Sequence, residues 1–136
     1  NNKTGVTNAL GKLTAYTFDA RGNVLTAKNP LNNTTTFTYN SLDLPLTVKT
    51  AGNRTTTFTY DVKGNKLTEA NPLGQTNTYT YNGFGLVTSA KNALNPTTTF
   101  SYDANGYVSS VVNPLSYGKS FTYDAMGNKL TESAGG

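Results

Sequence analysis

Cysteine, histidine and tryptophan are all missing from the 136 residues of this chain. Without cysteine and histidine there is no thiolate or imidazole nucleophile, no histidine acting as general acid or base, and no Cys/His zinc site. Charged residues make up only 13% of the chain, about half the share of a typical globular protein. These absences exclude most hydrolase chemistry. We therefore expect a protein that is not an enzyme and uses no cofactor and no metal.

The positive charge is thinly spread. The formal net charge of +4 comes from lysines and arginines that stand singly along the chain. A surface that follows phosphates needs clustered basic residues, so we expect no nucleic-acid partner. No apolar run approaches the ~18 residues of a membrane span, so we expect no membrane-spanning segment. The chain begins at Asn1 without a Met, which indicates a processed product or a segment of a longer protein.

Threonine and asparagine are abundant, and together they account for about a third of the sequence. Nine tyrosines and six phenylalanines accompany them, and hydrophobic residues make up 35%. That is more apolar material than a disordered segment carries. β-Branched and aromatic residues favour strands, so the composition predicts a folded β-protein.

One motif recurs every 21 residues without an insertion. It consists of an aromatic residue, Thr or Ser, a second aromatic residue, and then Asp or Asn. The second aromatic residues are Phe18, Tyr39, Tyr60, Tyr81, Tyr102 and Tyr123. Aspartates follow four of them, at Asp19, Asp61, Asp103 and Asp124, and glycines stand three residues beyond the Asp or Asn at Gly22, Gly64, Gly85, Gly106 and Gly127. The chain 1–136 is thus predicted to be a single array of about six repeats.

Each repeat has the pattern of a β-hairpin. Residues 34–39 alternate with a period of two, which is typical of a half-buried strand. One face would carry Thr35, Phe37 and Tyr39, and the other would carry Thr34, Thr36 and Thr38. The Asp-x-x-Gly segment that follows is typical of a type I turn with a left-handed Gly. A return strand then ends in Asn-Pro-Leu or a similar segment, where Pro suits a second turn. Residues 8–11 are in phase with this second motif.

The expected fold is all-β: an antiparallel hairpin meander of about twelve strands, with two strands per repeat and no helix longer than one turn. We expect the aromatic and Leu positions of all repeats on one face, with the Thr rows on the other. The aromatic residues of the motif would form the core of the array, each ring packed on its neighbour. So long a sheet accumulates twist, so we expect it to curl, in the manner of a shell or solenoid, or to pair with another copy.

This pattern resembles the YD-repeat, or Rhs, family. The resemblance rests on the segment Gly-Asn-Lys-Leu-Thr-Glu-Ala-Asn-Pro-Leu-Gly at 64–74 and on Tyr-Asp-x-x-Gly at 60–64, 102–106 and 123–127. It implies hairpins laid side by side in a long curled sheet. In bacterial Rhs proteins and toxin-complex C components such a sheet winds into a hollow shell around a toxic domain, and in teneurins it is part of a cell-surface adhesion protein.

Some positions depart from the family pattern. Asn40 and Asn82 replace the usual Asp, and Asp43 replaces the turn Gly of the second copy. The family's self-processing core region and a toxin domain are both missing from the sequence. The resemblance therefore implies a repeat array alone.

The carboxylates do not suggest catalysis. All five aspartates occupy predicted turns or their equivalents, where Asp caps its own backbone. Glu69 and Glu132 stand 63 residues apart, too far for an acid/base pair within one unit. One carboxylate per loop also falls short of the six to eight oxygens that calcium requires.

The aromatic rows have a second interpretation, as a ladder for stacking sugars, although a packing role is favoured. Three aromatic residues break the repeat pattern next to turns, and we expect them to be exposed candidates for binding a partner: Phe84, Tyr107 and Tyr117.

The leading functional hypothesis is a structural repeat module of a secreted or cell-surface protein, contributing to a shell, stalk or fibre. Alternatives are a module that binds surface glycan and a part of a shell that encapsulates a toxin. Unprotected edge strands invite pairing. The expected partners are therefore flanking repeats or further copies of the chain, joined end to end by strand pairing.

Overall fold

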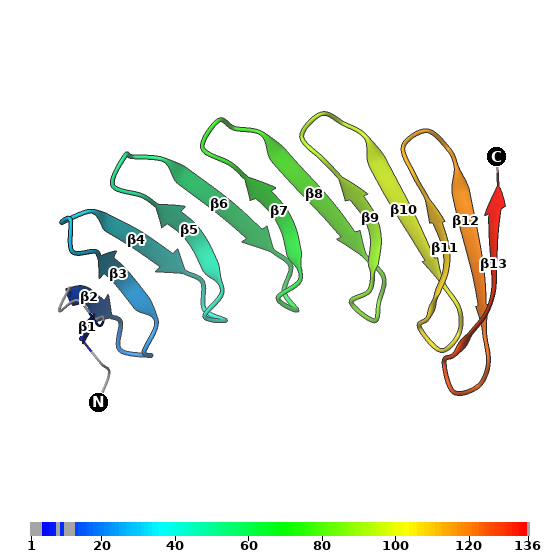
Figure 1. Cartoon of the computed structure of the whole chain (residues 1–136), viewed down its shortest axis with the longest axis horizontal. Helices are drawn as coiled ribbons and strands as arrows, with labels where there is room; N and C mark the ends of the chain where they lie inside the picture. Colours follow the sequence, from blue (N-terminus) through cyan, green and yellow to red (C-terminus); the bar gives the residue numbers. More distant parts are fainter. Residues whose placement is uncertain (1–3, 8, 10–12, 136) are drawn as a thin grey trace.

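The computed structural model describes residues 4–7, 9 and 13–135. They form one antiparallel sheet whose strand order follows the sequence from β1 to β13 (Figure 1). This confirms the predicted all-β hairpin meander. Most of the half unit expected at residues 8–11 lies outside the described residues. The strands are β1 Gly5–Thr7, β2 Leu13–Phe18, β3 Val24–Lys28, β4 Thr34–Tyr39, β5 Pro45–Lys49, β6 Thr55–Tyr60, β7 Lys66–Ala70, β8 Thr76–Tyr81, β9 Val87–Lys91, β10 Thr97–Tyr102, β11 Val108–Val112, β12 Gly118–Tyr123 and β13 Lys129–Gly135.

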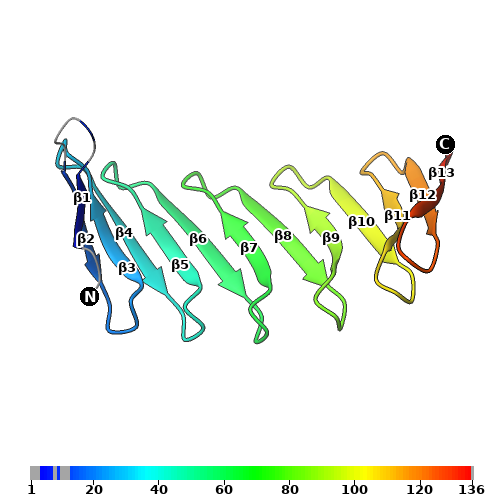
Figure 2. The same cartoon turned by 60° about the horizontal axis from the view of Figure 1, so that its bottom comes forward.

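The sheet is a single layer. Figures 1 and 2 show the hairpins side by side along a curved ribbon, with β1 at one end and β13 at the other. Each strand pairs only with its neighbours in sequence, and β1 and β13 do not meet. None of the described side chains is fully buried. The array is therefore held by contacts between neighbouring strands rather than by a common core.

The hairpin turns lie along two edges. The turns at 19–23, 40–44, 61–65, 82–86, 103–107 and 124–128 form what we call the lower edge, at the bottom of Figure 1. The turns at 29–33, 50–54, 71–75, 92–96 and 113–117 form the upper edge. The two edges differ in side chains, but their backbones follow one pattern.

The turn at 61–65 illustrates that pattern. The N–H of Gly64 donates to the carbonyl of Asp61 (3.1 Å), and the N–H of Asp61 donates to the carbonyl of Asn65 (2.9 Å). The Asp61 carboxylate accepts from the N–H groups of Lys63 and Asn65, both at 2.9 Å. A short acidic or amide side chain thus caps the turn, which explains why Asp or Asn begins nearly every one.

In each of the eleven turns named above, the fourth residue is left-handed, with φ between 58° and 93°. The sequence predicts this geometry only for the Asp/Asn-x-x-Gly turns, yet the upper-edge turns adopt it as well. Asn and Asp tolerate this conformation better than most residues, so Asp43 (φ 61°) keeps the turn that Gly makes elsewhere. The fourth residues are Gly22, Asn32, Asp43, Asn53, Gly64, Gly74, Gly85, Asn95, Gly106, Ser116 and Gly127.

A β-bulge places the leucines of the return strands on a different face of the sheet from the one predicted. The register shifts at the lower-edge end of each hairpin, between Thr59 and Tyr60 for example, so that two residues of the return strand face one residue of its partner. Lys66 and Glu69 consequently lie on one face, where they form an ion pair. The two residues between them turn to the Thr face. In the copy where Thr replaces this Leu, Thr88 contacts the hydroxyl of Thr80.

The leucines at this position therefore join the Thr rows rather than the aromatic stripe. They are Leu25, Leu46, Leu67 and Leu130. The Thr rows themselves are linked across the strands by hydroxyl pairs such as Thr59–Thr68 (2.6 Å). One face of the sheet is thus hydroxyl-rich, and the other carries the aromatic rings.

The turn aspartates predict a loss of stability in acid. The side-chain amides of Asn23, Asn65 and Asn128 donate to Asp19, Asp61 and Asp124 and hold the pKa of each carboxyl below its ordinary 3.8. A lowered pKa in the folded state means that the stabilising contribution is present above 3.8 and is lost as the pH falls through the folded value. We expect the melting temperature to fall below about pH 4.

The matched control replaces all three aspartates by Asn, the residue that already begins the turns at Asn40 and Asn82. Its melting temperature should fall less steeply in acid. Some acid sensitivity remains, because the ammonium groups of Lys119 and Lys129 lower the pKa of Glu132 to about 2. Equal slopes for the two proteins would show that these turns do not carry the effect.

Candidate functional site: the contacts between successive repeats

A tyrosine hydroxyl joins neighbouring hairpins near the lower edge. The ladder between β7 and β8 stops at the pair Thr68–Thr78, and the strands separate beyond it. There the hydroxyl of Tyr81 donates to the carbonyl of Lys66 at 2.7 Å. The side chain thereby supplies a partner that the ladder no longer provides. The same bond, at 2.7 to 3.0 Å, recurs as Tyr39–Val24, Tyr60–Pro45, Tyr102–Val87 and Tyr123–Val108.

These tyrosines are half-buried, and within residues 13–135 the motif tyrosines of successive repeats do not stack on one another. A return strand separates the tyrosines of successive repeats, which puts them roughly 10 Å apart, beyond ring contact. Burial nevertheless raises the pKa of the Tyr39, Tyr60 and Tyr81 hydroxyls. Phe18, the equivalent residue of the first copy, has no hydroxyl to donate.

Other groups occupy the space between the aromatic rows. The ammonium of Lys66 lies over the rings of Phe58 and Tyr79, at 5.8 and 5.3 Å from their centroids. It also pairs with Glu69. A hydrogen-bonded carboxylate is the main reason why the pKa of Lys66 is raised.

Successive lower-edge turns also contact one another. The fifth residue of each turn lies against the fourth residue of the next, which is usually Gly. A Cβ added to Gly64 would lie 3.2 Å from Leu44 Cδ1, and one added to Gly127 would lie 2.7 Å from Tyr107 Cζ. Glycine is therefore favoured at this position for two reasons: it adopts the left-handed backbone easily, and it leaves space for the fifth residue of the preceding turn.

Asp43 uses a polar version of the same contact. Its carboxylate accepts from the side-chain amide of Asn23 at 2.6 Å and from Arg21 Nε at 3.0 Å. The Arg21 guanidinium also donates to the carbonyls of Ser41 and Asn40, both at 2.9 Å. The departure of Asp43 from the repeat pattern is thus matched by the residues of the preceding turn.

The carboxylates serve turns and ion pairs. The five aspartates stand in lower-edge turns. Glu69 pairs with Lys66, and Glu132 pairs with both Lys119 and Lys129. Among the described residues, no three Asp or Glu side chains gather as a metal site would require. The same part of the chain contains no helix that could cross a membrane.

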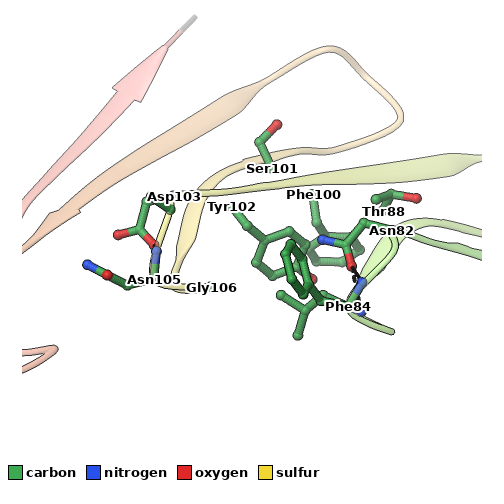
Figure 3. A pocket seen from close by; sticks show the side chains of 11 residues that line it. Asn82, Phe84, Thr88, Phe100, Ser101, Tyr102, Asp103, Asn105 and Gly106 are labelled. Atoms are coloured by element: carbon green, nitrogen blue, oxygen red, sulfur yellow. Dashed lines mark hydrogen bonds between the residues drawn. The ribbon is translucent and has the colours of Figure 1, made fainter.

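A hollow of about 720 Å³ lies between the lower-edge turns 82–86 and 103–107. Figure 3 shows the rings of Phe84, Phe100 and Tyr102 around it. The Asn82 side chain there accepts from the N–H groups of Phe84 and Leu86, both at 3.0 Å. The hollow offers apolar surface, and the side chains of Thr88, Ser101 and Asp103 also line it.

The three aromatic residues that break the pattern fall in different environments. Phe84 is 92% exposed and Tyr117 is 58% exposed. Tyr107 was also expected to be exposed, but it is half-buried, and its ring lies 5.1 Å from that of Tyr123. As the fifth residue of its turn, it fills the place that Leu44 and Leu86 fill elsewhere.

The contact between turns can be tested with two Gly→Ala variants. Gly127→Ala and Gly74→Ala both put a Cβ on a left-handed backbone, at about 1–2 kcal/mol each. Only Gly127→Ala also displaces Tyr107 from Tyr123, because no atom lies within 4 Å of a Cβ at Gly74. We expect Gly127→Ala to lower the free energy of unfolding by about 1 kcal/mol more. Denaturant unfolding measures the difference, and in a Tyr107→Ala background it should disappear; a difference that persists there would refute the contact.

The hydroxyl bond can be tested with Tyr60→Phe. Loss of its bond to Pro45 should lower the free energy of unfolding by about 0.5–1.5 kcal/mol. Tyr79→Phe is the matched control, because Phe already stands at that position of the motif in Phe37, Phe58, Phe100 and Phe121. Equal losses in the two variants would contradict the role given to the hydroxyl.

Comparison with known proteins supports the same architecture. The sequence model of the family described as Teneurin YD-shell matches residues 2–131. No curated protein matches the sequence. The solved TcdB2-TccC3-Cdc42 structure resembles 89% of this chain over 7% of its own, with a TM-score of 0.74 and 20% identity. The Tc holotoxin pore of Photorhabdus luminescens resembles 90% of this chain over 9% of its own, with a TM-score of 0.62 and 17% identity.

At these identities the solved structures show the fold alone, and this chain spans less than a tenth of their length. The family match, in contrast, extends over nearly every repeat. The chain therefore belongs to the Teneurin YD-shell family.

Proposed function

We propose that this chain is a structural, non-enzymatic segment of the wall of a YD shell, carried by a secreted or cell-surface protein. One observation supports this most directly: the family match covers a single-layer sheet in which each repeat is joined to the next by the same contacts. Such an array can be extended without changing its local structure. Its tyrosine hydroxyls join successive repeats and its aspartates cap turns, and that is why we assign these groups no catalytic role.

The wall would continue by strand pairing at the ends of the sheet. β1 and β13 each have a neighbour on one side only, and the side chains of β13 are exposed along its whole length. An uncovered edge strand is a template for another strand. The partners would be flanking repeats of a longer chain, or further copies of this one. In either case a following hairpin would use the contacts that already join one repeat to the next.

Two other functions remain as alternatives. In a longer protein, this segment could be part of a shell around a toxin, as in the bacterial members that the repeat resembles. Exposed aromatic rings at Phe84 and Tyr117 favour a glycan-binding module. Glycan binding that is lost in Tyr117→Ala, with the fold intact, would support that alternative.

Strand pairing at β13 can be tested with proline. Backbone N–H groups of consecutive residues point alternately to the two sides of a strand, so one of Ser133→Pro and Ala134→Pro removes a bond to β12 and the other alters only the free edge. Sedimentation velocity should show that the wild type associates as its concentration rises. The variant that keeps the wild-type melting temperature should lose this association. A wild type that stays monomeric at every concentration would contradict end-to-end pairing.

A further inference from the structure

The hollow between turns 82–86 and 103–107 combines aromatic rings with a negative charge. Figure 3 shows the rings, and Asp103 is the charged residue among those that line the hollow. Between residues 82 and 118 the sequence contains a single basic residue, Lys91, and it lies at the upper-edge end of β9. Aromatic faces beside a carboxylate are the chemistry that recognises organic cations.

Asp103 differs from the other turn aspartates in how its carboxylate is used. Its Oδ1 accepts from the N–H groups of Asn105 and Tyr107, both at 2.9 Å. In three other turns that begin with Asp, the second carboxylate oxygen accepts from a side-chain amide at 2.8 to 3.0 Å; these amides belong to Asn23, Asn65 and Asn128. Tyr107 stands at the equivalent position and carries no amide. Oδ2 of Asp103 therefore lacks this donor and can accept from a ligand.

Two earlier turns show a cation in the equivalent place. The ammonium of Lys63 donates to the carbonyl of Gly83 in the following turn at 2.8 Å. The guanidinium of Arg21 donates to the carbonyl of Ser41 in the following turn at 2.9 Å. In both cases a cation at the third position of one turn reaches the second residue of the next. A backbone carbonyl at this position of the array is thus a proven acceptor for a cation.

Phe84 stands at that third position in the turn 82–86. The equivalent acceptor in the following turn is the carbonyl of Ala104, a residue that lines the hollow. A phenyl ring has no hydrogen to donate to it. Phe84 is also 92% exposed, so its ring face is available at the rim of the hollow.

Aromatic rings of this array already bind ammonium groups. Lys66 lies over Phe58, and the ammonium of Lys129 lies 5.7 Å from the ring centroid of Phe121. Phe100 occupies the same position of the motif. Valine stands in place of the lysine on both return strands beside Phe100, at Val87 and Val108. Phe100 therefore lacks the cation that Phe58 and Phe121 have.

We propose that this hollow binds a small organic cation that carries a primary ammonium group on an alkyl chain. The ammonium donates to Oδ2 of Asp103 and to the carbonyl of Ala104, and the alkyl chain lies against the rings of Phe84 and Tyr102. A cavity of about 720 Å³ is within the usual size range of small-molecule sites. This binding goes beyond the structural role proposed above, which does not depend on it.

Titration with hexylamine, followed by NMR of the backbone amides of the full chain, tests the proposal. Hexanol is the matched ligand control, because it has the same alkyl chain without the charge. We expect saturable shifts in residues 84–86 and 103–106, with tighter binding of hexylamine than of hexanol. Asp103→Asn keeps the cap of the turn, as Asn40 and Asn82 do in theirs. It should weaken hexylamine binding about two- to fivefold.

Phe84→Lys provides the sharpest test, because it gives this turn the residue that Lys63 gives the turn before. Its own ammonium should take the place of the ligand and abolish hexylamine binding. Met126→Lys adds the same charge at an equivalent tip that is 86% exposed, and it should bind hexylamine as the wild type does.

Three results would overturn the proposal. Hexanol that binds as tightly as hexylamine would show that the hollow does not recognise a cation. Equal losses in Phe84→Lys and Met126→Lys would show that net charge, rather than this hollow, governs the binding. Shifts that do not saturate in residues 84–86 and 103–106 would remove the site itself, and the structural role of the segment would be unaffected.

Discussion

The lack of a second layer is the constraint on which the rest of this structure depends. A single antiparallel sheet has no interior, and no described side chain is fully buried. Hydrophobic burial in one shared core therefore cannot hold the repeats together. Each repeat must instead be fixed to the next by contacts that recur with the same period, and the tyrosine hydroxyl and the turn-to-turn packing are such contacts. Both lie near the lower edge, where the ladder between neighbouring hairpins has stopped.

This arrangement explains why individual residues vary while the contact persists. Leu44 packs over Gly64, and Asn23 and Arg21 bind Asp43. The residue of one repeat is thus matched to a residue of the following repeat rather than to its own hairpin. Repeats matched in this way are not interchangeable, and their order is part of the fold. The same coupling suits a wall, since it fixes local geometry while allowing the sheet to continue.

Much of the fold could be predicted because the period of 21 residues is uninterrupted. The alternation in residues 34–39 predicts the bounds of β4, and the Asp-x-x-Gly segments predict the turns that follow such strands. The side of Leu67 was predicted wrongly, because a bulge shifts the alternation and leaves no mark in the sequence pattern. The repeat pattern alone makes Asp43 a departure, because its partners Arg21 and Asn23 lie one repeat earlier. The hydroxyl bond left a signal: the second aromatic of the motif is Tyr in five of six copies, whereas the first is mostly Phe.

Site-resolved amide hydrogen exchange on the isolated chain tests the central claim most directly, namely that neighbouring repeats stabilise one another without a common core. In such an array a central repeat has two stabilising neighbours and a terminal repeat has one. The account predicts protection that is highest in β6 to β9 and declines stepwise toward both ends. Uniform protection from β2 to β13, lost in one cooperative step, would contradict it.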